Sequence, residues 1–264
     1  MKKISFTDGT YTLIGAYYEV FNHTSRTFPE YIYELAMMEE VRQRGISVIR
    51  QDKHEITYKN YRVGWQELDL FIGGEIVVEN KAVERLTRLH KAQCISYIKA
   101  VDKMTGLLLN FAGSEPEYHR LYFDPAKKPS KTTSDHVPSP ASDWLYPDLT
   151  YKIIGALYEV HDILGAGFVY RIYANACYRE LGMRGLAVKS AKRIQIAYKN
   201  NPIGEVPFAN ILIEGKVLLF PVAIGSLQDI HVDNLRHWMA LSNIRLGILA
   251  NFDAVSLQMR VIRL

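Results

Sequence analysis

The chain has 264 residues, of which 48% are hydrophobic and 23% are charged, so it can bury a sizeable core and differs from disordered and fibrous proteins. No apolar run reaches the roughly 18 residues of a membrane-spanning helix, and the two cysteines, Cys94 and Cys177, have neither disulfide-framework nor zinc-site spacing. We therefore expect a soluble cytoplasmic protein without a membrane partner, and its net charge of +4 permits a polyanionic partner without requiring one.

Two amphipathic helices are predicted near the N-terminus. Apolar residues recur at helical spacing through residues 11–23. A second helix begins near Pro29 and ends before Gly45, which is suited to a C-cap position. One face of this second helix carries Glu30, Tyr33, Met37 and Val41.

Four strands are expected next, arranged as two hairpins. The segments ISVIRQ, from Ile46, and EITYKN, from Glu55, form the first predicted hairpin. The segments WQELDLFI, from Trp65, and EIVVENKA, from Glu75, form the second around the pair Gly73-Gly74.

Residues 84–104 predict a third helix, and GLLLNF, from Gly106, predicts a buried strand. The predicted sheet-facing side of the helix carries Leu86, Leu89, His90, Gln93, Tyr97, Ala100, Val101 and Met104. The opposite side carries Arg85, Arg88, Lys99 and Lys103, for which a solvated exterior is favoured over a nucleic-acid track. The order of elements predicts an α/β or α+β fold with a mixed sheet flanked by helices.

The elements then recur along the chain. YTLIGAYYEV, from Tyr11, returns as YKIIGALYEV, from Tyr151, and ITYKNYRVG returns as IAYKNNPIG, both at an offset of 140 residues. After Gly204 the offset becomes 141, so the second copy carries one inserted residue.

We infer one domain present twice, at residues 1–123 and 144–264. Residues 124–143 are rich in Pro, Ser, Thr and Lys and predict a linker. The two copies are expected to form a pseudo-dimer within the chain, and the sequence does not predict further oligomerisation.

The second hairpin of the first copy gathers charged residues on one face. A three-residue loop of Gly73, Gly74 and Glu75 sets Ile72 opposite Ile76 and brings Asp69 opposite Glu79. A two-residue loop would separate these carboxylates, so the prediction depends on the loop. Opposed carboxylates suit a hard divalent cation such as Mg²⁺.

Simpler explanations exist for each part of this candidate site. An ExK triplet such as Glu79-Asn80-Lys81 arises by chance in a chain this long, and Glu214-Gly-Lys216 is a second example. His90 and Gln93, if buried, need hydrogen-bond partners that the carboxylate site would supply, although a polar network without chemistry would also satisfy them.

In combination, these residues resemble a known family. Asp69, Glu79-Asn80-Lys81 and the later Gln93 and Tyr97 resemble the PD-(D/E)xK nuclease core, which has a restriction-endonuclease-like fold, with its RecB-type QxxxY extension. Residues 27–33, TFPEYIY, resemble the GxxExxY motif, for which a family of small bacterial proteins in that superfamily is named.

The first copy departs from these motifs at two positions. Thr27 stands where the motif has Gly, and Asn80 stands where an apolar residue is common. Thr27 and Glu30 also have the spacing of a helix capping box, which explains Glu30 as well as a metal-site role does.

The second copy departs far more, and we expect it to be degenerate and unable to hold a metal. Its replacements are Asn210 for the Asp, Phe220 for the Glu, Val222 for the Lys, Asn234 for the Gln, Trp238 for the Tyr and Tyr170 for the Glu of GxxExxY.

The resemblance implies metal-dependent hydrolysis of nucleic-acid phosphodiesters by the first copy, with DNA favoured over RNA and with Mg²⁺, or alternatively Mn²⁺, as cofactor. Asp69 and Glu79 are the expected metal ligands. The expected catalytic residues are Lys81, Gln93, Tyr97 and Glu30. The alternative is a non-catalytic nucleic-acid-binding or scaffold protein on the same fold.

Overall fold

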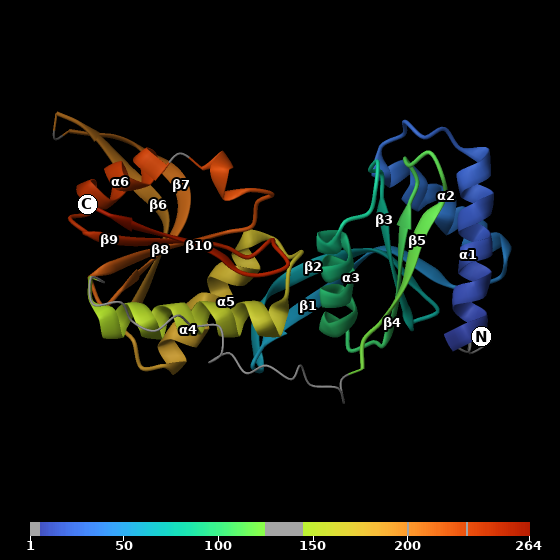
Figure 1. Ribbon diagram of the computed structural model, residues 1–264, viewed down its shortest axis with the longest axis horizontal. Coiled ribbons are helices and arrows are strands. Elements are labelled where there is room, and N and C mark those ends of the chain that lie inside the picture. The colour runs from blue at the N-terminus through green and yellow to red at the C-terminus, as the bar shows by residue number, and fades with distance from the viewer. Residues whose placement is uncertain (1–5, 125–144, 200, 231) are drawn as a thin grey trace. The chain divides into compact units, whose positions relative to one another are not determined.

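The computed structural model describes residues 6–124, 145–199, 201–230 and 232–264 (Figure 1). The chain divides into two compact units, Met1–Ile56 with Trp65–Lys128, and Thr57–Gly64 with Pro129–Leu264. Apart from residue 124, the predicted linker at 124–143 lies outside the described residues. Among the described residues, no helix is both long enough and apolar enough to cross a bilayer.

The first copy of the repeat forms a five-stranded mixed sheet in the order β1-β2-β3-β4-β5. Strands β3 and β4 are parallel, whereas β2 with β3 and β4 with β5 are antiparallel. Its elements are α1 (Phe6–His23), α2 (Glu30–Gln43), β1 (Val48–Tyr58), β2 (Tyr61–Ile72), β3 (Ile76–Lys81), α3 (Arg88–Ala100), β4 (Thr105–Asn110) and β5 (Glu117–Tyr122).

The second copy repeats this topology, with the sheet order β10-β9-β8-β7-β6 and a single parallel pair, β8 with β9, among the described pairings. The predicted fold class, a mixed sheet flanked by helices and present twice, is therefore confirmed. Its elements are α4 (Pro147–Leu164), α5 (Tyr170–Met183), β6 (Val188–Tyr198), β7 (Asn201–Ile213), β8 (Val217–Val222), η2 (Leu227–Asp229), α6 (Val232–Leu241), β9 (Leu246–Asn251) and β10 (Gln258–Arg263).

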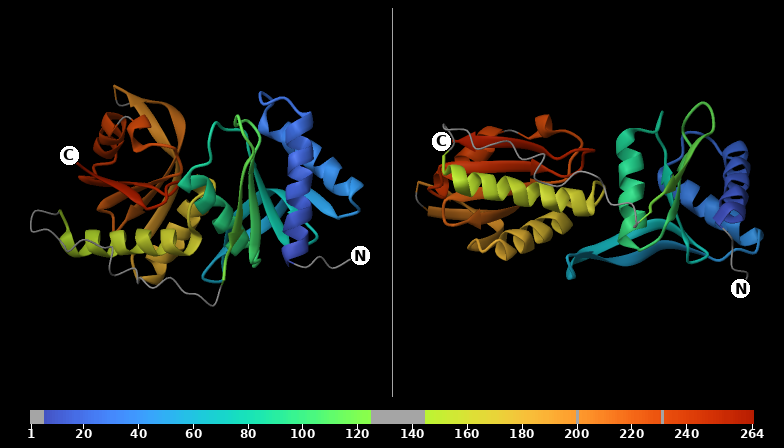
Figure 2. Two further views of the ribbon diagram at one scale, coloured as in Figure 1. Left: turned by 45° about the vertical axis from the view of Figure 1, so that its right-hand side comes forward. Right: turned by 60° about the horizontal axis from the view of Figure 1, so that its bottom comes forward.

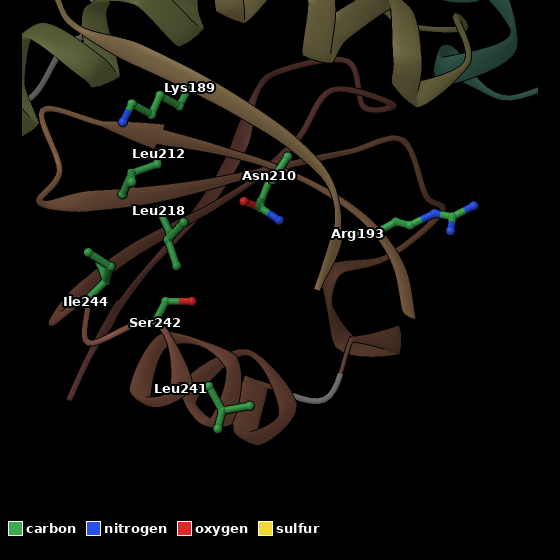
Figure 3. Close-up of a pocket in the computed structure, with 9 residues that line it drawn as sticks. Lys189, Arg193, Asn210, Leu212, Leu218, Leu241, Ser242 and Ile244 are labelled. Atoms are coloured by element: carbon green, nitrogen blue, oxygen red, sulfur yellow. The ribbon is translucent and has the colours of Figure 1, made fainter. Parts of the chain in front are cut away.

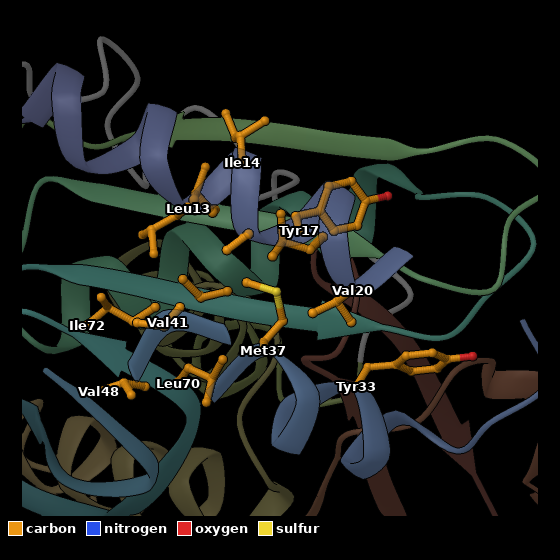
Figure 4. Close-up of a cluster of buried hydrophobic side chains, with 14 of the residues drawn as sticks. Leu13, Ile14, Tyr17, Val20, Tyr33, Met37, Val41, Val48, Leu70 and Ile72 are labelled. Atoms are coloured by element: carbon orange, nitrogen blue, oxygen red, sulfur yellow. The ribbon is translucent and has the colours of Figure 1, made fainter. Parts of the chain in front are cut away.

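In the first copy, helices cover both faces of the sheet (Figure 2). One face packs against α1 and α2, where Leu13, Tyr17 and Met37 meet Leu70 and Ile72 in a single buried cluster (Figure 4). Alternation along the strands turns the neighbouring side chains to the other face, which α3 covers.

Glycine allows α3 to lie close to the sheet. A Cβ added at Gly106 on β4 would come within 2.6 Å of Ile98 Cδ1 on α3. The repeat preserves this contact, since a Cβ added at Gly247 on β9 would come within 2.6 Å of Met239 Sδ on α6. The glycine that opens both GLLLNF and GILANF is therefore required by helix packing.

The first predicted hairpin is wrong. ISVIRQ and EITYKN belong to one strand, β1, and the turn lies after Tyr58, where Lys59 and Asn60 have φ values of 45° and 69°. The polar residues between the two segments reflect the alternation of buried and exposed side chains along β1. Gln51, with φ of 53°, supplies a local irregularity without reversing the chain.

The second predicted hairpin is confirmed. Ile72 pairs with Ile76 and Leu70 pairs with Val78, as the three-residue loop requires. Gly73 and Gly74 have φ values of 63° and 73°, a conformation that glycine adopts without strain.

Candidate active site

Asp69 on β2 and Glu79 on β3 lie beside each other where the pairing of these strands ends. The backbone pairs extend to Leu70–Val78, and the Asn80 N–H then donates to Asp69 Oδ2 at 2.8 Å. Beyond Val78, a side-chain hydrogen bond thus takes the place of backbone pairing between the two strands. The paired residues stop one position short of Asp69 and Glu79, although the Glu79 carboxylate lies near enough for its charge to raise the pKa of Asp69.

The side chain of Lys81 lies between Glu79 and Glu30, which is on helix α2. Its Nζ donates to Glu79 Oε1 at 2.7 Å and lies 3.7 Å from Glu30 Oε1. The predicted capping box of Thr27 and Glu30 is wrong, because the N-cap of α2 is Pro29 and no side chain among the described residues caps that helix end. The Glu30 carboxylate is directed to Lys81 instead.

Glu34 is a site residue that the sequence reasoning missed. It lies one helical turn after Glu30 and is buried, with only 4% of its surface exposed. Arg50 Nε lies 2.9 Å from Glu34 Oε2, and Gln51 Nε2 donates to the same oxygen at 2.8 Å. The available signal was a carboxylate on the buried face of an amphipathic helix, next to Tyr33.

The pKa values of the site residues reflect burial and the closeness of several carboxylates. Burial and the neighbouring Glu79 charge raise the pKa of Asp69 to about 8, and Glu34 adds to this rise. Burial likewise raises the pKa of Glu79. Burial alone would lower the pKa of Lys81, but the charges of Glu79 and Glu30 outweigh it and raise the pKa, so Lys81 remains protonated near neutral pH.

The donor set fits a hard divalent cation. Glu79 Oε2 is buried and has no hydrogen-bond partner among the described residues, so one carboxylate oxygen is left for another ligand. Carboxylate oxygens are the ligands that Mg²⁺ prefers, and a cation would relieve the repulsion that raises both carboxyl pKa values. Within the described ranges, however, no three His, Cys, Asp or Glu side chains are grouped as a ready metal cage.

Helix α3 lies against the site, although it is turned differently from the prediction. Cys94 is fully buried against β4, with its Sγ 4.0 Å from the Leu107 carbonyl oxygen, and burial followed by the charge of Glu79 raises the pKa of its thiol. The buried residues of α3 are Cys94, Ser96, Tyr97 and Ile98. Tyr97 is therefore buried as predicted, while Gln93 is half-buried. Their participation in the site stays a prediction.

The expectation that His90 faces the sheet is wrong. Helix α3 begins at Arg88 rather than near residue 84, and Thr87 is its N-cap. The Thr87 side chain accepts from the His90 N–H, and His90 Nδ1 accepts from the Thr87 N–H, each at 3.2 Å. His90 therefore caps the helix.

The second copy carries other residues at the positions equivalent to Asp69, Glu79 and Lys81. Phe220 occupies the position equivalent to Glu79 and is fully buried in the core against α6. A hollow of about 380 Å³ lies beside Asn210, with the charged ends of Lys189 and Arg193 far apart across it (Figure 3). At the offset of 140 residues, Ala174 and Ala191 replace Glu34 and Gln51.

Comparison with known proteins agrees with this geometry. A family model described as the PD-(D/E)XK nuclease superfamily matches residues 7–121 and again residues 147–264. No curated protein matches the chain. Two matches that together span most of the sequence, each covering one copy of the repeat, show that the chain belongs to the PD-(D/E)XK nuclease superfamily.

Proposed function

We propose that the first domain is a metal-dependent nuclease that hydrolyses phosphodiester bonds of nucleic acid. The observation that carries the proposal is the convergence of Asp69, Glu79 and Lys81 at one end of the sheet in a member of this superfamily. These three residues come from two neighbouring strands, β2 and β3, and the hydrogen bond from the Asn80 N–H to Asp69 supports their grouping.

Asp69 and Glu79 are the proposed ligands of Mg²⁺, with Mn²⁺ as an alternative. When bound, such an ion would polarise a phosphoryl oxygen and lower the pKa of a coordinated water. The unsatisfied Glu79 Oε2 and the raised carboxyl pKa values support this assignment.

Lys81 is proposed to act as a fixed positive charge. Its pKa is raised despite burial, so it is unsuited to accept a proton from water and suited to stabilise negative charge developing on the phosphate. The Glu30 carboxylate lies 3.7 Å from the same ammonium group. We propose Glu34 as a positioning residue, because Arg50 and Gln51 fix its carboxylate.

Gln93 and Tyr97 are proposed to position the scissile phosphate or the attacking water from α3. The motif at residues 27–33 supports placing the chain within the GxxExxY family. We retain DNA as the favoured substrate over RNA and the cytoplasm as the compartment.

We propose that residues 144–264 form a structural pseudonuclease, with the intact domain at 1–123, a linker at 124–143 and a pseudo-dimer within the chain. The complete exclusion of Phe220 from solvent supports this division of roles. A hydrophobic residue in place of the metal-binding acid leaves no ligand there for a hard cation.

The test is cleavage of single- and double-stranded DNA and RNA panels with Mg²⁺, with Mn²⁺ and with chelator. Asp69→Asn and Lys81→Ala should each lower the rate by about 10²- to 10³-fold while circular dichroism stays unchanged. Lys216→Ala is the matched control, because Lys216 ends the ExK triplet of the second copy and should be dispensable. Wild-type protein that neither binds a divalent metal nor cuts any substrate would favour the non-catalytic binding or scaffold alternative.

A further inference from the structure

The turn of the β1–β2 hairpin anchors itself within the second unit. The Tyr58 hydroxyl donates to Glu180 Oε2 at 2.8 Å. Lys59 Nζ pairs with the same Glu180 oxygen at 2.9 Å and with Glu159 Oε1 at 2.8 Å. Tyr58 is fully buried. A tyrosine and a lysine from one turn thus bind two glutamates, one on α4 and one on α5.

Apolar contacts complete this anchor. A Cβ added at Gly64 would come within 2.7 Å of Ile172 Cγ1, so the backbone lies directly on α5. Asn175 Nδ2 donates to the Val63 carbonyl at 2.7 Å. Both Val63 and Ile172 are 1% exposed.

We call the turn of the β1–β2 hairpin, with the residues up to Gly64, the first arm. The corresponding residues at the turn of the β6–β7 hairpin form a second arm. Tyr198, Lys199 and Gly204 correspond to Tyr58, Lys59 and Gly64 at the offset of 140 residues. The local geometry matches too. Lys199 has φ of 48° against 45° for Lys59, and each ammonium lies over the preceding tyrosine ring, at 5.4 Å and 5.5 Å.

This second arm carries equivalent side chains, with Ile203 in place of Val63, but exposes them. Tyr198 is 61% exposed and Ile203 is 65% exposed. No described atom lies within 4 Å of a Cβ built at Gly204. The second arm therefore repeats the residues of the first one, but its side chains are exposed where those of the first arm are buried.

The repeat also supplies a second receiving surface, on α1 and α2. Glu19 and Glu40 correspond to Glu159 and Glu180, and Ile32 corresponds to Ile172. A hollow of about 250 Å³ opens there, and its lining consists of Glu19, Val20, His23, Thr24, Ala36, Glu39, Glu40 and Gln43.

The surface on α4 and α5 and its counterpart on α1 and α2 each contain an arginine–glutamate ion pair, but the exposure of the glutamate differs. Arg44 pairs with Glu40 at 2.8 Å, just as Arg184 pairs with Glu180 at 2.8 Å. The Glu40 side chain, however, is 23% exposed, against 3% for Glu180. The α1–α2 surface thus repeats the two glutamates and the supporting arginine of the occupied surface, with Glu39 in place of Arg179.

We propose that the β6–β7 arm of one molecule docks on the α1–α2 surface of a second copy of this chain. Tyr198 and Lys199 bind Glu40 and Glu19 of the neighbour as Tyr58 and Lys59 bind Glu180 and Glu159. Each molecule carries both an arm and a surface, and in the proposed assembly two copies exchange arms reciprocally, which makes the dimer closed.

The second arm should bind more weakly than the first. Asn201 stands in place of Tyr61, whose ring lies 5.1 Å from the Arg179 guanidinium, and Leu35 stands in place of Asn175. The exposed contact therefore lacks a cation–π pair and an amide hydrogen bond. Such losses suit a reversible association, in contrast to the permanent anchor of the first arm.

The experiment is sedimentation velocity of the full chain over the micromolar range. Wild-type protein should dimerise, and Lys199→Glu or Glu19→Lys should each raise the dimer Kd by at least about tenfold. An equimolar mixture of the two variants should recover the dimer, because each variant arm then meets a surface of opposite charge. Lys216→Glu, in the neighbouring β7–β8 turn, is the matched control and should leave the Kd unchanged.

Isotope-labelled mixtures identify the contact directly. Carbodiimide cross-linking of a mixture of ¹⁴N and ¹⁵N chains should give Lys199–Glu19 or Lys199–Glu40 peptides that contain both isotopes. A wild-type monomer at all concentrations would overturn the proposal. So would cross-links confined to one isotope, which would show the arm folding back on its own chain.

Discussion

The carboxyl group of Asp69 is buried close to a second carboxyl group, that of Glu79. Its pKa is raised to about 8 by burial and by Glu79, so the folded protein holds its proton more tightly than the unfolded chain does. A raised carboxyl pKa favours folding below the unfolded value, near 4, and that contribution is lost as the pH rises towards 8.

Asp69→Asn should therefore stabilise the metal-free protein. Its advantage in free energy of unfolding should grow between about pH 4 and pH 8 and then level off, reaching about 1 to 4 kcal/mol. Urea denaturation across this pH range, with chelator present, measures the difference. An advantage that does not change with pH would contradict the assignment of a raised pKa to Asp69.

Glu34 should act on the chemistry through its charge. After burial and Glu79, the Glu34 carboxylate also contributes to the raised pKa of Asp69. Glu34→Gln should lower that pKa, so the rise of the cleavage rate with pH should move to lower pH. The pH–rate profile is the measurement, and Glu39→Gln, an exposed position on the same helix, should leave the profile in place.

At the scale of elements, the close contact between helix and sheet depends on one glycine in each copy. Gly106→Ala and Gly247→Ala should each lower the free energy of unfolding by about 1 to 3 kcal/mol, because the new Cβ overlaps Ile98 or Met239. Gly182→Ala in α5 is the control. A Cβ there meets no described atom within 4 Å, so alanine should stabilise the helix by up to about 1 kcal/mol. Thermal unfolding distinguishes the two outcomes.

A substitution in the packing of β8 against α6 tests whether the second domain contributes to stability alone or also to catalysis. Phe220→Ala should cost about 3 to 5 kcal/mol of stability, because the side chain is fully buried. Cleavage by the remaining folded protein should change little if the second domain is structural. A loss of activity at temperatures where the variant is fully folded would instead give the second domain a catalytic role.

At the scale of the whole molecule, the boundaries of the sequence repeat and of the folded units differ. Residues 57–64 belong to the first copy in sequence but to the second unit in the structure. There, Tyr58, Lys59 and Arg184 offset the burial of Glu180 and lower its pKa.

A chain comprising only residues 144–264 should consequently be less stable than the same region of the intact protein. It lacks Tyr58 and Lys59, so Glu180 keeps one partner, Arg184, of the three that bind it. Losing partners of a buried carboxylate costs about 1 to 3 kcal/mol for each unmatched group. Calorimetry of the fragment and the full chain tests this, and equal transition temperatures would show that the arm is dispensable.

Local patterns in the sequence were enough to predict those parts of the structure that depend on residues close together in the chain. Alternation along β2 and β3, together with two glycines at the turn, fixed a register that brings Asp69 beside Glu79, because only one register buries Leu70 and Val78. The duplication could also be recognised from the sequence, because it is a repeat in the residues themselves. The orientation of α3 could not, because its buried face is decided by the packing of Cys94 and Ile98 on Gly106 of β4, whereas the cap between Thr87 and His90 decides only where the helix begins.

What the sequence determined by itself is the repeated fold, the paired carboxylates with Lys81, and their absence from the second copy. Only the tertiary structure decided that Glu30 reaches Lys81, that Glu34 belongs to the same cluster, and that one hairpin turn is anchored on Glu180 while its counterpart is exposed. The physical reason is separation along the chain. These contacts join segments tens to more than a hundred residues apart, and the folding of the chain alone brings them within hydrogen-bond distance.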